Sequence, residues 1–370
     1  MHFTLHLTAR CNLRCSYCYV DHDDREMSWE TARATVELAG RSAKRAGLVF
    51  FGGEPLLRRD LVYATVAYAR AREDELGCRF FFKITTNGLL LDSEFLDFAC
   101  REDLFIALSL DGSKEAHDLH RRDAQGQDSY CAATKTARKL LALKPYSTAL
   151  MTVSPDTLSR YADGVEELFN LGFLYVIPSL DYSANWQEED LPELTRQYEK
   201  LAELYERKTL AEDKFYFSPF EVKISSHVNS KSYCHERCEL GLRQLSVGPE
   251  GKLYPCIQFV GDPEFVIGNV WEGIDEALRQ ALYERNEEEK PGCDRCGIRA
   301  RCNHYCACLN RQATGSIDLV SPMLCAHERI VLPIADRLAE RLFHQGNALF
   351  VQKHYNDFFP LLSLIEDRFV

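Results

Sequence analysis

The chain lacks an apolar run long enough to cross a membrane, since no stretch of its 370 residues approaches the roughly 18 apolar residues that a spanning helix needs. It also lacks a targeting signal, because residues 1–7 contain no basic region followed by a continuous apolar stretch. An excess of positive charge is missing too: 44 Lys and Arg stand against 56 Asp and Glu. We therefore expect a cytoplasmic protein that does not span a membrane and has no general affinity for nucleic acid.

Cysteine is the residue that the chain has in excess. A composition of 46% hydrophobic and 27% charged residues is that of a globular protein, but it includes 15 cysteines. Cellular thiols keep cytosolic cysteines reduced, so a disulfide framework is not expected. Three cysteines lie between residues 11 and 18 and nine between 234 and 325, and such grouping indicates metal binding. Cys78, Cys100 and Cys131 stand alone beside apolar residues and are assigned no role.

The first half of the chain alternates β-rich and helical segments. The pattern predicts strands at 3–7, 48–51, 79–84, 105–110, 147–153 and 173–177, and helices at 28–46, 60–75, 93–101, 129–143 and 157–170. Repeated βα units build a parallel sheet whose strands all end on one face, where loops assemble a site in open sheets and barrels alike. We therefore predict an α/β fold with six parallel strands and a domain boundary near residue 225.

A group of three cysteines follows directly on the first predicted strand. Cys11, Cys15 and Cys18 have the spacing C-x3-C-x2-C, which places three thiolates in one loop at the end of that strand. A cubane iron-sulfur cluster uses one cysteine for each iron, so three cysteines leave the fourth iron open to a small molecule. On spacing alone, a zinc site completed by His6 or His22 is the alternative.

Small polar turns follow the next three predicted strands. They are Gly52-Gly53-Glu54-Pro55, Thr85-Thr86-Asn87-Gly88 and Ser109-Leu110-Asp111-Gly112. Each is an ordinary turn when considered alone. Together with the cysteine loop they occupy the same end of four successive strands, which turn chemistry does not require, so they indicate a site.

The cysteine loop resembles that of the radical S-adenosylmethionine (SAM) enzymes. Their motif, C-x-x-x-C-x-aromatic-C, is matched by Cys11, Cys15, Tyr17 and Cys18. The resemblance covers about residues 1–225 and implies a partial (β/α)6 TIM-like barrel over that range. It also implies a [4Fe-4S] cluster whose open iron binds the amino and carboxylate groups of SAM.

The same resemblance implies contacts between this chain and SAM. Tyr17 would lie against the adenine. The G-G-E motif, here Gly52, Gly53 and Glu54, would hold the amino group. Ser109 and Arg121 would bind the carboxylate, a role that suits the planar fork of an arginine.

The second group of cysteines spells a longer motif. Cys238 and a G-x4-C ending in Cys256 precede C-x2-C-x5-C-x3-C at Cys293, Cys296, Cys302 and Cys306, and Cys325 follows. Zinc takes pairs of close cysteines, so two zinc sites are one alternative. The order of these seven cysteines resembles the SPASM domain, which implies two auxiliary [4Fe-4S] clusters. On this basis we place a SPASM domain at 226–330 and a C-terminal helical segment at 331–370.

The SPASM resemblance also implies how the cysteines divide between the auxiliary clusters. The first would be held by Cys234, Cys238, Cys256 and Cys306, and the second by Cys293, Cys296, Cys302 and Cys325. Cys234 lies only four residues before Cys238, and without Cys234 the first cluster would have an iron open to substrate. Cys308 fits no position of the motif and is either a packed thiol or a substitute ligand.

The resemblance implies an activity as well. In this family SAM is cleaved reductively to a 5'-deoxyadenosyl radical, which abstracts hydrogen from the substrate, and SPASM enzymes mostly modify peptides or proteins. The sequence motif C-x-Q-F-V-G that begins at Cys256 is similar to that of maturases forming thioethers, so we expect a thioether crosslink in a ribosomally synthesised peptide. Carbon-carbon (cyclophane-type) crosslinking and sulfatase-maturase-like oxidation are the alternatives. Sulfatase-maturing members carry an Asp where this chain has Ile257.

The expected partners follow from that activity. They are a peptide or protein substrate and an electron donor such as flavodoxin or ferredoxin. Because the predicted barrel begins at residue 3, leader recognition would fall to a separate leader-recognition protein, to the aromatic C-terminal tail, or be unnecessary for a folded protein substrate. The sequence identifies no catalytic acid or base. The alternatives from other classes are a zinc scaffold and an electron-transfer iron-sulfur protein, the second of which would have no use for Gly52-Gly53-Glu54 or the Ser109 and Arg121 pair.

Overall fold

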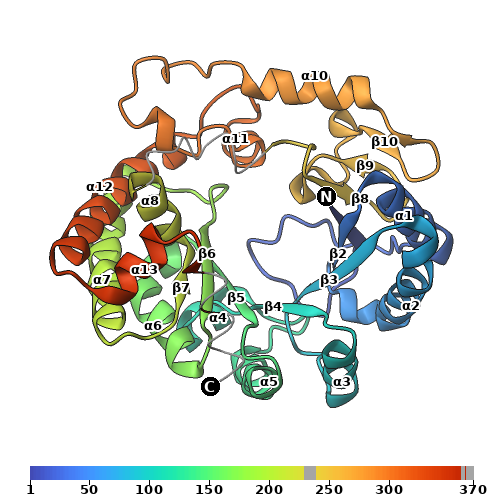
Figure 1. The fold of residues 1–370 in the computed structure, drawn as a ribbon, viewed down its shortest axis with the longest axis horizontal. Coiled ribbons are helices and arrows are strands. Elements are labelled where there is room, and N and C mark those ends of the chain that lie inside the picture. The colour runs from blue at the N-terminus through green and yellow to red at the C-terminus, as the bar shows by residue number, and fades with distance from the viewer. Residues whose placement is uncertain (229–238, 360–362, 364–370) are drawn as a thin grey trace.

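One curved sheet runs through both cysteine-bearing parts of the chain (Figure 1). The computed structural model describes residues 1–228, 239–359 and 363, and within them nine strands follow the order β7-β6-β5-β4-β3-β2-β1-β8-β9. Their bounds are β1 (His2–Thr8), β2 (Arg45–Gly52), β3 (Arg79–Thr86), β4 (Phe105–Ser109), β5 (Thr148–Val153), β6 (Tyr175–Leu180), β7 (Tyr216–Phe217), β8 (Gln244–Val247) and β9 (Leu253–Tyr254). All neighbouring pairs are parallel except β8 and β9.

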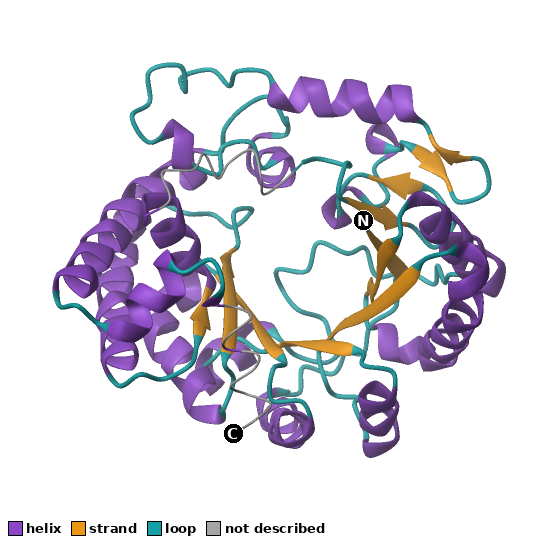
Figure 2. Ribbon diagram, in the orientation of Figure 1, coloured by secondary structure: helices purple, strands orange, loops and turns teal. Residues whose placement is uncertain are grey.

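Helices cover the outer face of this arc (Figure 2). In the first part they are α1 (Trp29–Ser42), α2 (Arg59–Leu76), α3 (Ser93–Arg101), α4 (Lys114–His120), α5 (Tyr130–Leu143), α6 (Tyr161–Leu171), α7 (Leu191–Leu210) and α8 (Ser218–Val228). Local sequence sets where they begin: the Ser28 hydroxyl accepts a hydrogen bond from Thr31 N at 3.1 Å, and the Asp92 carboxylate accepts one from Phe95 N at 3.0 Å.

The second cysteine region continues the sheet of the first. Strand β8 pairs with β1 from His2 with Gln244 to Leu5 with Val247, so β1 is an inner strand and six of its seven residues are buried. The chain from β8 through α10 (Glu276–Glu287) and α11 (Ala307–Thr314) then spans the open side of the arc (Figure 1). It includes the short hairpin β10 (Gly268–Asn269) and β11 (Gly273–Ile274).

The C-terminal helices return to the other edge of the arc. α12 (Pro322–His344) packs against α7 and α8, and α13 (Ala348–Tyr355) follows it. A buried ion pair crosses the contact between α8 and α12, with Lys223 Nζ 2.6 and 2.8 Å from the two carboxylate oxygens of Glu328. Removing one partner of such a pair costs several kcal/mol, on the order of 3–5, because the other charge stays buried.

The predicted fold class is confirmed: an α/β partial barrel is followed by a cysteine-rich region and C-terminal helices. All six predicted strands form, and the predicted helix at 157–170 begins with a 3-10 turn at Pro155–Arg160. Strands β7, β8 and β9 were not predicted, because segments of two to four residues carry too little periodicity. The domain limits at 225 and 330 stay predictions, since the two parts share one sheet.

Among the described helices, none is both long and apolar enough to cross a bilayer.

Protonation of His117 on α4 is predicted to destabilise the fold. Its Nδ1 accepts from Asp111 N at 3.3 Å, and its Nε2 lies 2.9 Å from Ser129 Oγ. Burial, with the nearby charge of Arg121, lowers the pKa of His117 to about 4. Between pH 6.5 and 4, His117 is therefore protonated in the unfolded chain but neutral in the folded chain. The contribution of His117 to the free energy of unfolding thus falls as the pH falls toward 4.

From pH 7 to pH 5 we expect His117 alone to lower the unfolding free energy by about 2 kcal/mol. Urea unfolding at both pH values tests this, and His117→Asn, whose Oδ1 can replace Nδ1 as acceptor, should lose that part of the pH dependence. His344→Asn changes an exposed histidine and should behave as the wild type does. Equal pH dependence in the two variants would contradict the prediction.

Candidate active site

A cavity of about 360 Å³ lies where the carboxyl ends of the parallel strands meet. Four sets of residues line it. The cysteine loop contributes Cys11, Cys15, Tyr17, Cys18, Tyr19 and His22; the strand ends contribute Gly52, Gly53, Thr86, Asn87, Ser109, Thr152 and Asp181; the end of α4 contributes Arg121; and the second region contributes Ile257, Gln258, Leu309 and Gln312. The volume suits a small-molecule ligand. The structure thus brings together the three thiols and all the predicted SAM contacts except Glu54.

The cysteine loop is fixed to the C-terminal end of α4 and to the residues that follow this helix. Arg14 N donates to Arg122 O at 2.6 Å, and Ser16 Oγ lies 2.6 Å from His120 Nδ1. Leu13 N is 3.4 Å and Asn87 Nδ2 is 3.8 Å from the sulfur of Cys11, so donors face that sulfur. Burial raises the pKa of the Cys11 thiol to about 12, and the thiolate therefore needs adjacent positive charge such as iron. These residues fit a three-cysteine iron-sulfur cluster.

Asp111 joins three parts of the cavity wall. Its carboxylate accepts from Arg121 Nε at 2.8 Å and Nη2 at 3.2 Å, from Thr152 N at 2.9 Å, and from the Tyr17 hydroxyl. Burial alone would raise the pKa of Asp111, but the charge and hydrogen bonds of Arg121 outweigh it and hold the pKa below its usual value. Arg121 borders the cavity while one edge of its guanidinium is engaged by Asp111.

Glu54 lies behind the cavity wall and does not line it. Its carboxylate accepts from Leu56 N at 3.0 Å, Asn87 N at 2.9 Å and Thr86 Oγ1 at 2.7 Å. It thereby connects the turn after β2 to the end of β3, and burial raises its pKa. The predicted contact of Glu54 with SAM stays a prediction, whereas Gly52 and Gly53 border the cavity directly.

The second region contains two groups of thiols. In one group, Cys293 lies within electrostatic reach of Cys296 and Cys325, and Cys302 within reach of Cys325. Arg329 places Nη2 3.6 Å from the Cys296 sulfur. These are the four predicted ligands of the second auxiliary cluster.

The other group is Cys256, Cys306 and Cys308, which share one buried cluster of side chains. Cys234 and Cys238, also predicted for the first auxiliary cluster, lie outside the described residues. Within the described ranges, no three His, Cys, Asp or Glu side chains gather as they do around a single metal ion. A four-iron cluster spaces its thiolates more widely, because each sulfur binds a different iron.

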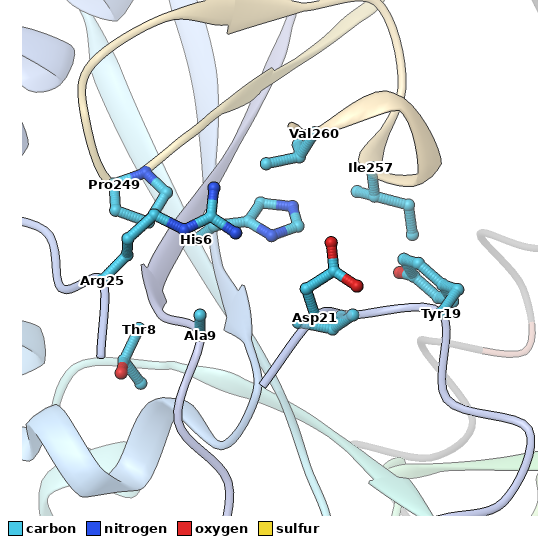
Figure 3. A pocket seen from close by; sticks show the side chains of 10 residues that line it. His6, Thr8, Ala9, Tyr19, Asp21, Arg25, Pro249, Ile257 and Val260 are labelled. Atoms are coloured by element: carbon cyan, nitrogen blue, oxygen red, sulfur yellow. The ribbon is translucent and has the colours of Figure 1, made fainter. Parts of the chain in front are cut away.

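A smaller cavity of about 40 Å³ lies beside the first and marks the seam between the two regions (Figure 3). Tyr19, next to the cluster loop, lies beside Ile257 of the second region, and both residues line both cavities. His6 lines only the smaller one, so it faces away from the cavity of the thiols, whereas His22 borders that cavity. Burial lowers the pKa of His6 to about 3.

Residues 5–171 match the model of the Radical SAM superfamily, and residues 238–303 match that of SPASM, an iron-sulfur cluster-binding domain. The chain is 24% identical over 303 residues to a cysteine-type anaerobic sulfatase-maturating enzyme of Clostridium perfringens, covering 76% of this chain and 80% of that one. It is 25% identical over 295 residues to the antilisterial bacteriocin subtilosin biosynthesis protein AlbA of Bacillus subtilis, covering 75% and 59%. The solved structure of native anSMEcpe with bound AdoMet and Cp18Cys peptide has a TM-score of 0.80 at 19% identity, covering 93% and 99%.

The barrel, its thiol-lined cavity and the family match together define a radical SAM enzyme. More particularly, the chain is a radical SAM enzyme with a C-terminal SPASM domain, and its cofactors are SAM and [4Fe-4S] clusters, three in number as in that family. Sequence reasoning missed the role of Asp111, which it treated only as part of a turn. Its signal was an acidic residue at the end of a strand, ten positions before an arginine.

Replacing Gly53 by Ala is predicted to disable SAM cleavage. A Cβ at Gly53 would overlap the carbonyl group of Arg10, the residue before the first cluster cysteine. The loop must then move, and a shift of this kind lowers the rate of 5'-deoxyadenosine formation by roughly 100-fold. In the matched variant Gly297→Ala, the Cβ meets no atom within 4 Å, and the rate should be that of the wild type. Equal rates in the two variants would contradict the close contact.

Proposed function

We propose that this enzyme oxidises one residue of a peptide or protein segment that enters the cavity between the barrel and the SPASM region. The proposal rests on one observation, which is that both regions line the same cavity. The cluster thiols line one side of it, and the other side is lined by Ile257, Gln258, Leu309 and Gln312. Likeness to sulfatase-maturating relatives supports oxidation of a substrate side chain. Likeness in fold to anSMEcpe bound to AdoMet and a peptide supports a peptide in the corresponding place.

The cofactors supply a one-electron cleavage of SAM that yields the hydrogen-abstracting radical, and the auxiliary clusters supply an acceptor for the electron that the substrate loses. The chain itself orients SAM and excludes water. Arg121 and Ser109 line the side of the cavity that would hold the SAM carboxylate. The Tyr17 ring, whose centroid is 5.3 Å from Arg121 Cζ, is fixed by Asp111.

The opposite wall offers a contact for substrate. Gln258 borders the cavity, and its Oε1 is buried with no hydrogen-bond partner among the residues described. A buried acceptor without a partner is costly, so this oxygen is suited to a donor on the substrate, such as a peptide N–H.

Asp181 is our candidate for the proton acceptor. Oxidation of a substrate thiol or hydroxyl releases a proton, and the position after Cys256, where sulfatase-maturing members carry Asp, is Ile257 here. Asp181, at the end of β6, is the carboxylate that lines the cavity within the described part of the chain. Ser183 holds one of its oxygens through backbone N at 3.0 Å.

A thioether crosslink is the second candidate product. The sequence motif from Cys256 to Gly261 favours a thioether product, and so does the similarity to the relative named for subtilosin biosynthesis. The two products differ chemically, because side-chain oxidation leaves an aldehyde that reacts with a hydrazide. A thioether consumes the thiol without forming a carbonyl.

The function is tested by anaerobic incubation with SAM, a reductant and two peptides. One is a sulfatase-derived peptide with a single Cys or Ser target, and the other is a cysteine-bearing peptide encoded beside this gene. We expect a hydrazide-reactive product or a crosslink that has lost two hydrogens, measured by mass spectrometry. SAM cleavage with neither peptide nor a folded sulfatase modified would contradict a role in peptide or protein maturation.

Cys15→Ala is predicted to abolish 5'-deoxyadenosine formation without emptying the auxiliary sites. The reason is that Cys15 belongs to the cavity of the SAM cluster, so the variant should retain about eight of about twelve irons. Iron analysis and chromatography of the nucleoside measure both. Cys131→Ala, which removes an exposed thiol on α5, is the control with both quantities unchanged. Continued SAM cleavage by the folded Cys15 variant would overturn the site assignment.

Asp181→Asn is predicted to slow peptide oxidation by roughly 100-fold, the usual contribution of a general base, while SAM is still cleaved. The ratio of modified peptide to 5'-deoxyadenosine should therefore fall. Asp163→Asn alters an exposed carboxylate on α6 and serves as control. If the ratio is unchanged in the Asp181 variant, another group accepts the proton.

A further inference from the structure

Asn87, directly after β3, connects two motifs of the cavity wall. Its backbone N donates to Glu54 Oε2 at 2.9 Å, and its side-chain Nδ2 donates to Asn12 Oδ1 at 2.7 Å. The same Nδ2 lies 3.8 Å from Cys11 Sγ, which is within hydrogen-bonding distance for sulfur. Asn87 is 8% exposed and lines the cavity, so the turn after β2, the end of β3 and the cysteine loop meet at this residue.

The turn that begins at Asn87 decides which end of its amide faces the sulfur. Asn87 Oδ1 accepts a hydrogen bond from Leu89 N at 3.0 Å, and this contact directs Nδ2 toward the cysteine loop. An amide nitrogen carries two hydrogens, so Nδ2 has one for Asn12 and one for the sulfur of Cys11. Both ends of the amide are therefore engaged.

A role in the turn alone does not account for this amide. Aspartate or serine can also accept the N–H of the residue two positions further on. The amide differs from both in its N–H donors, and at position 87 these donors face Asn12 and Cys11. Leu13 N is a second donor toward the same sulfur, at 3.4 Å. Two N–H groups thus face one predicted cluster ligand.

Glu54 and Thr86 hold this turn in place from behind. The Glu54 carboxylate accepts from both Thr86 Oγ1 and Asn87 N, and Thr86 Oγ1 accepts from Gly88 N at 3.0 Å. The backbone is therefore fixed on both sides of Asn87, and its amide is positioned by protein contacts alone. Second-shell contacts of this kind orient and tune the ligands of a metal site.

We propose that Asn87 raises the reduction potential of the SAM cluster by donating a hydrogen bond from Nδ2 to the sulfur of Cys11. Reduction adds one negative charge to a [4Fe-4S] cluster and its thiolates. An N–H donor at a thiolate stabilises the more negative state more strongly, so hydrogen bonds to the sulfurs help to set the potential. Asn87 acts through Cys11 and is therefore a positioning residue. The proposal rests on Cys11 as an iron ligand and does not depend on which peptide is modified.

The test is a redox titration of Asn87→Ser followed by electron paramagnetic resonance. The serine hydroxyl can still accept from Leu89 N, but it is too short to reach Cys11. The signal of the SAM cluster is the one that changes when SAM is added and that is missing from the Cys15→Ala protein. At a fixed potential, we expect the ratio of reduced to oxidised SAM cluster to be about tenfold below that of the wild type, or ~59 mV for a one-electron couple.

Asn356→Ser is the matched control. Asn356 Oδ1 accepts from Phe358 N at 3.0 Å in a turn of the same kind, at the end of α13. This variant should have the potential of the wild type. A SAM-cluster signal that persists in Cys15→Ala would overturn the site itself, whereas loss of that signal together with equal potentials in Asn87→Ser and Asn356→Ser would overturn only the role of Asn87.

Asn87→Asp is the second variant and decides the matter if Asn87→Ser assembles no SAM cluster. Aspartate keeps the size of the side chain and the acceptor for Leu89 N, but it has no N–H and adds a negative charge. The ratio of reduced to oxidised cluster should therefore fall by more than tenfold. A potential equal to that of the Asn356→Ser control would overturn the proposal. Loss of the SAM cluster from both Asn87 variants would overturn it as well, because the proposal gives Asn87 no share in holding iron.

Discussion

The carboxylate of Asp111 connects the separate parts of the barrel mouth. It accepts hydrogen bonds from Arg121, from the backbone of β5 at Thr152, and from Tyr17 in the cysteine loop. Asp111 is 1% exposed and Arg121 7%, so neither charge is stable there without the other. Because Tyr17 lies between the second and third cluster cysteines, the ion pair also determines where the loop sits. The order of the cavity therefore depends on one buried pair of charges.

A second constraint acts on the other wall. Strand β8 adds to β1, and β1 leads directly into the cysteine loop. The pairing holds the start of the SPASM region against the strand that carries the first cluster, and Tyr19 lies beside Ile257 at the resulting seam (Figure 3). The ion pair of Lys223 and Glu328 fixes the opposite edge through α12. Substrate enters, on our proposal, between walls that are both anchored to the barrel.

Several features of the fold could be predicted because their signals are local. Strands β1 to β6 have four or more apolar or β-branched residues each, and the spacing of Cys11, Cys15 and Cys18 is contained within eight residues. The short strands β7 and β9 have two residues each and form only because an existing sheet edge supplies their partners. The extension of the sheet by β8 is likewise a contact between residues more than 200 positions apart.

The features of the candidate site also fall into those that local sequence predicts and those that depend on long-range contacts. Sequence alone determined the cysteine motifs, the turns at the strand ends and hence the class of enzyme, because these depend on residue type and spacing. Only the tertiary structure decided that Glu54 lies behind the cavity, that Asp111 engages Arg121, that Asp181 borders the cavity, and that Cys308 belongs to the same buried cluster as Cys256. Each of these is a contact between segments separated along the chain or a matter of which way a side chain faces. Such contacts are set by the packing of the whole sheet, so a local pattern such as the spacing of Asp111 and Arg121 can suggest a contact but does not determine it.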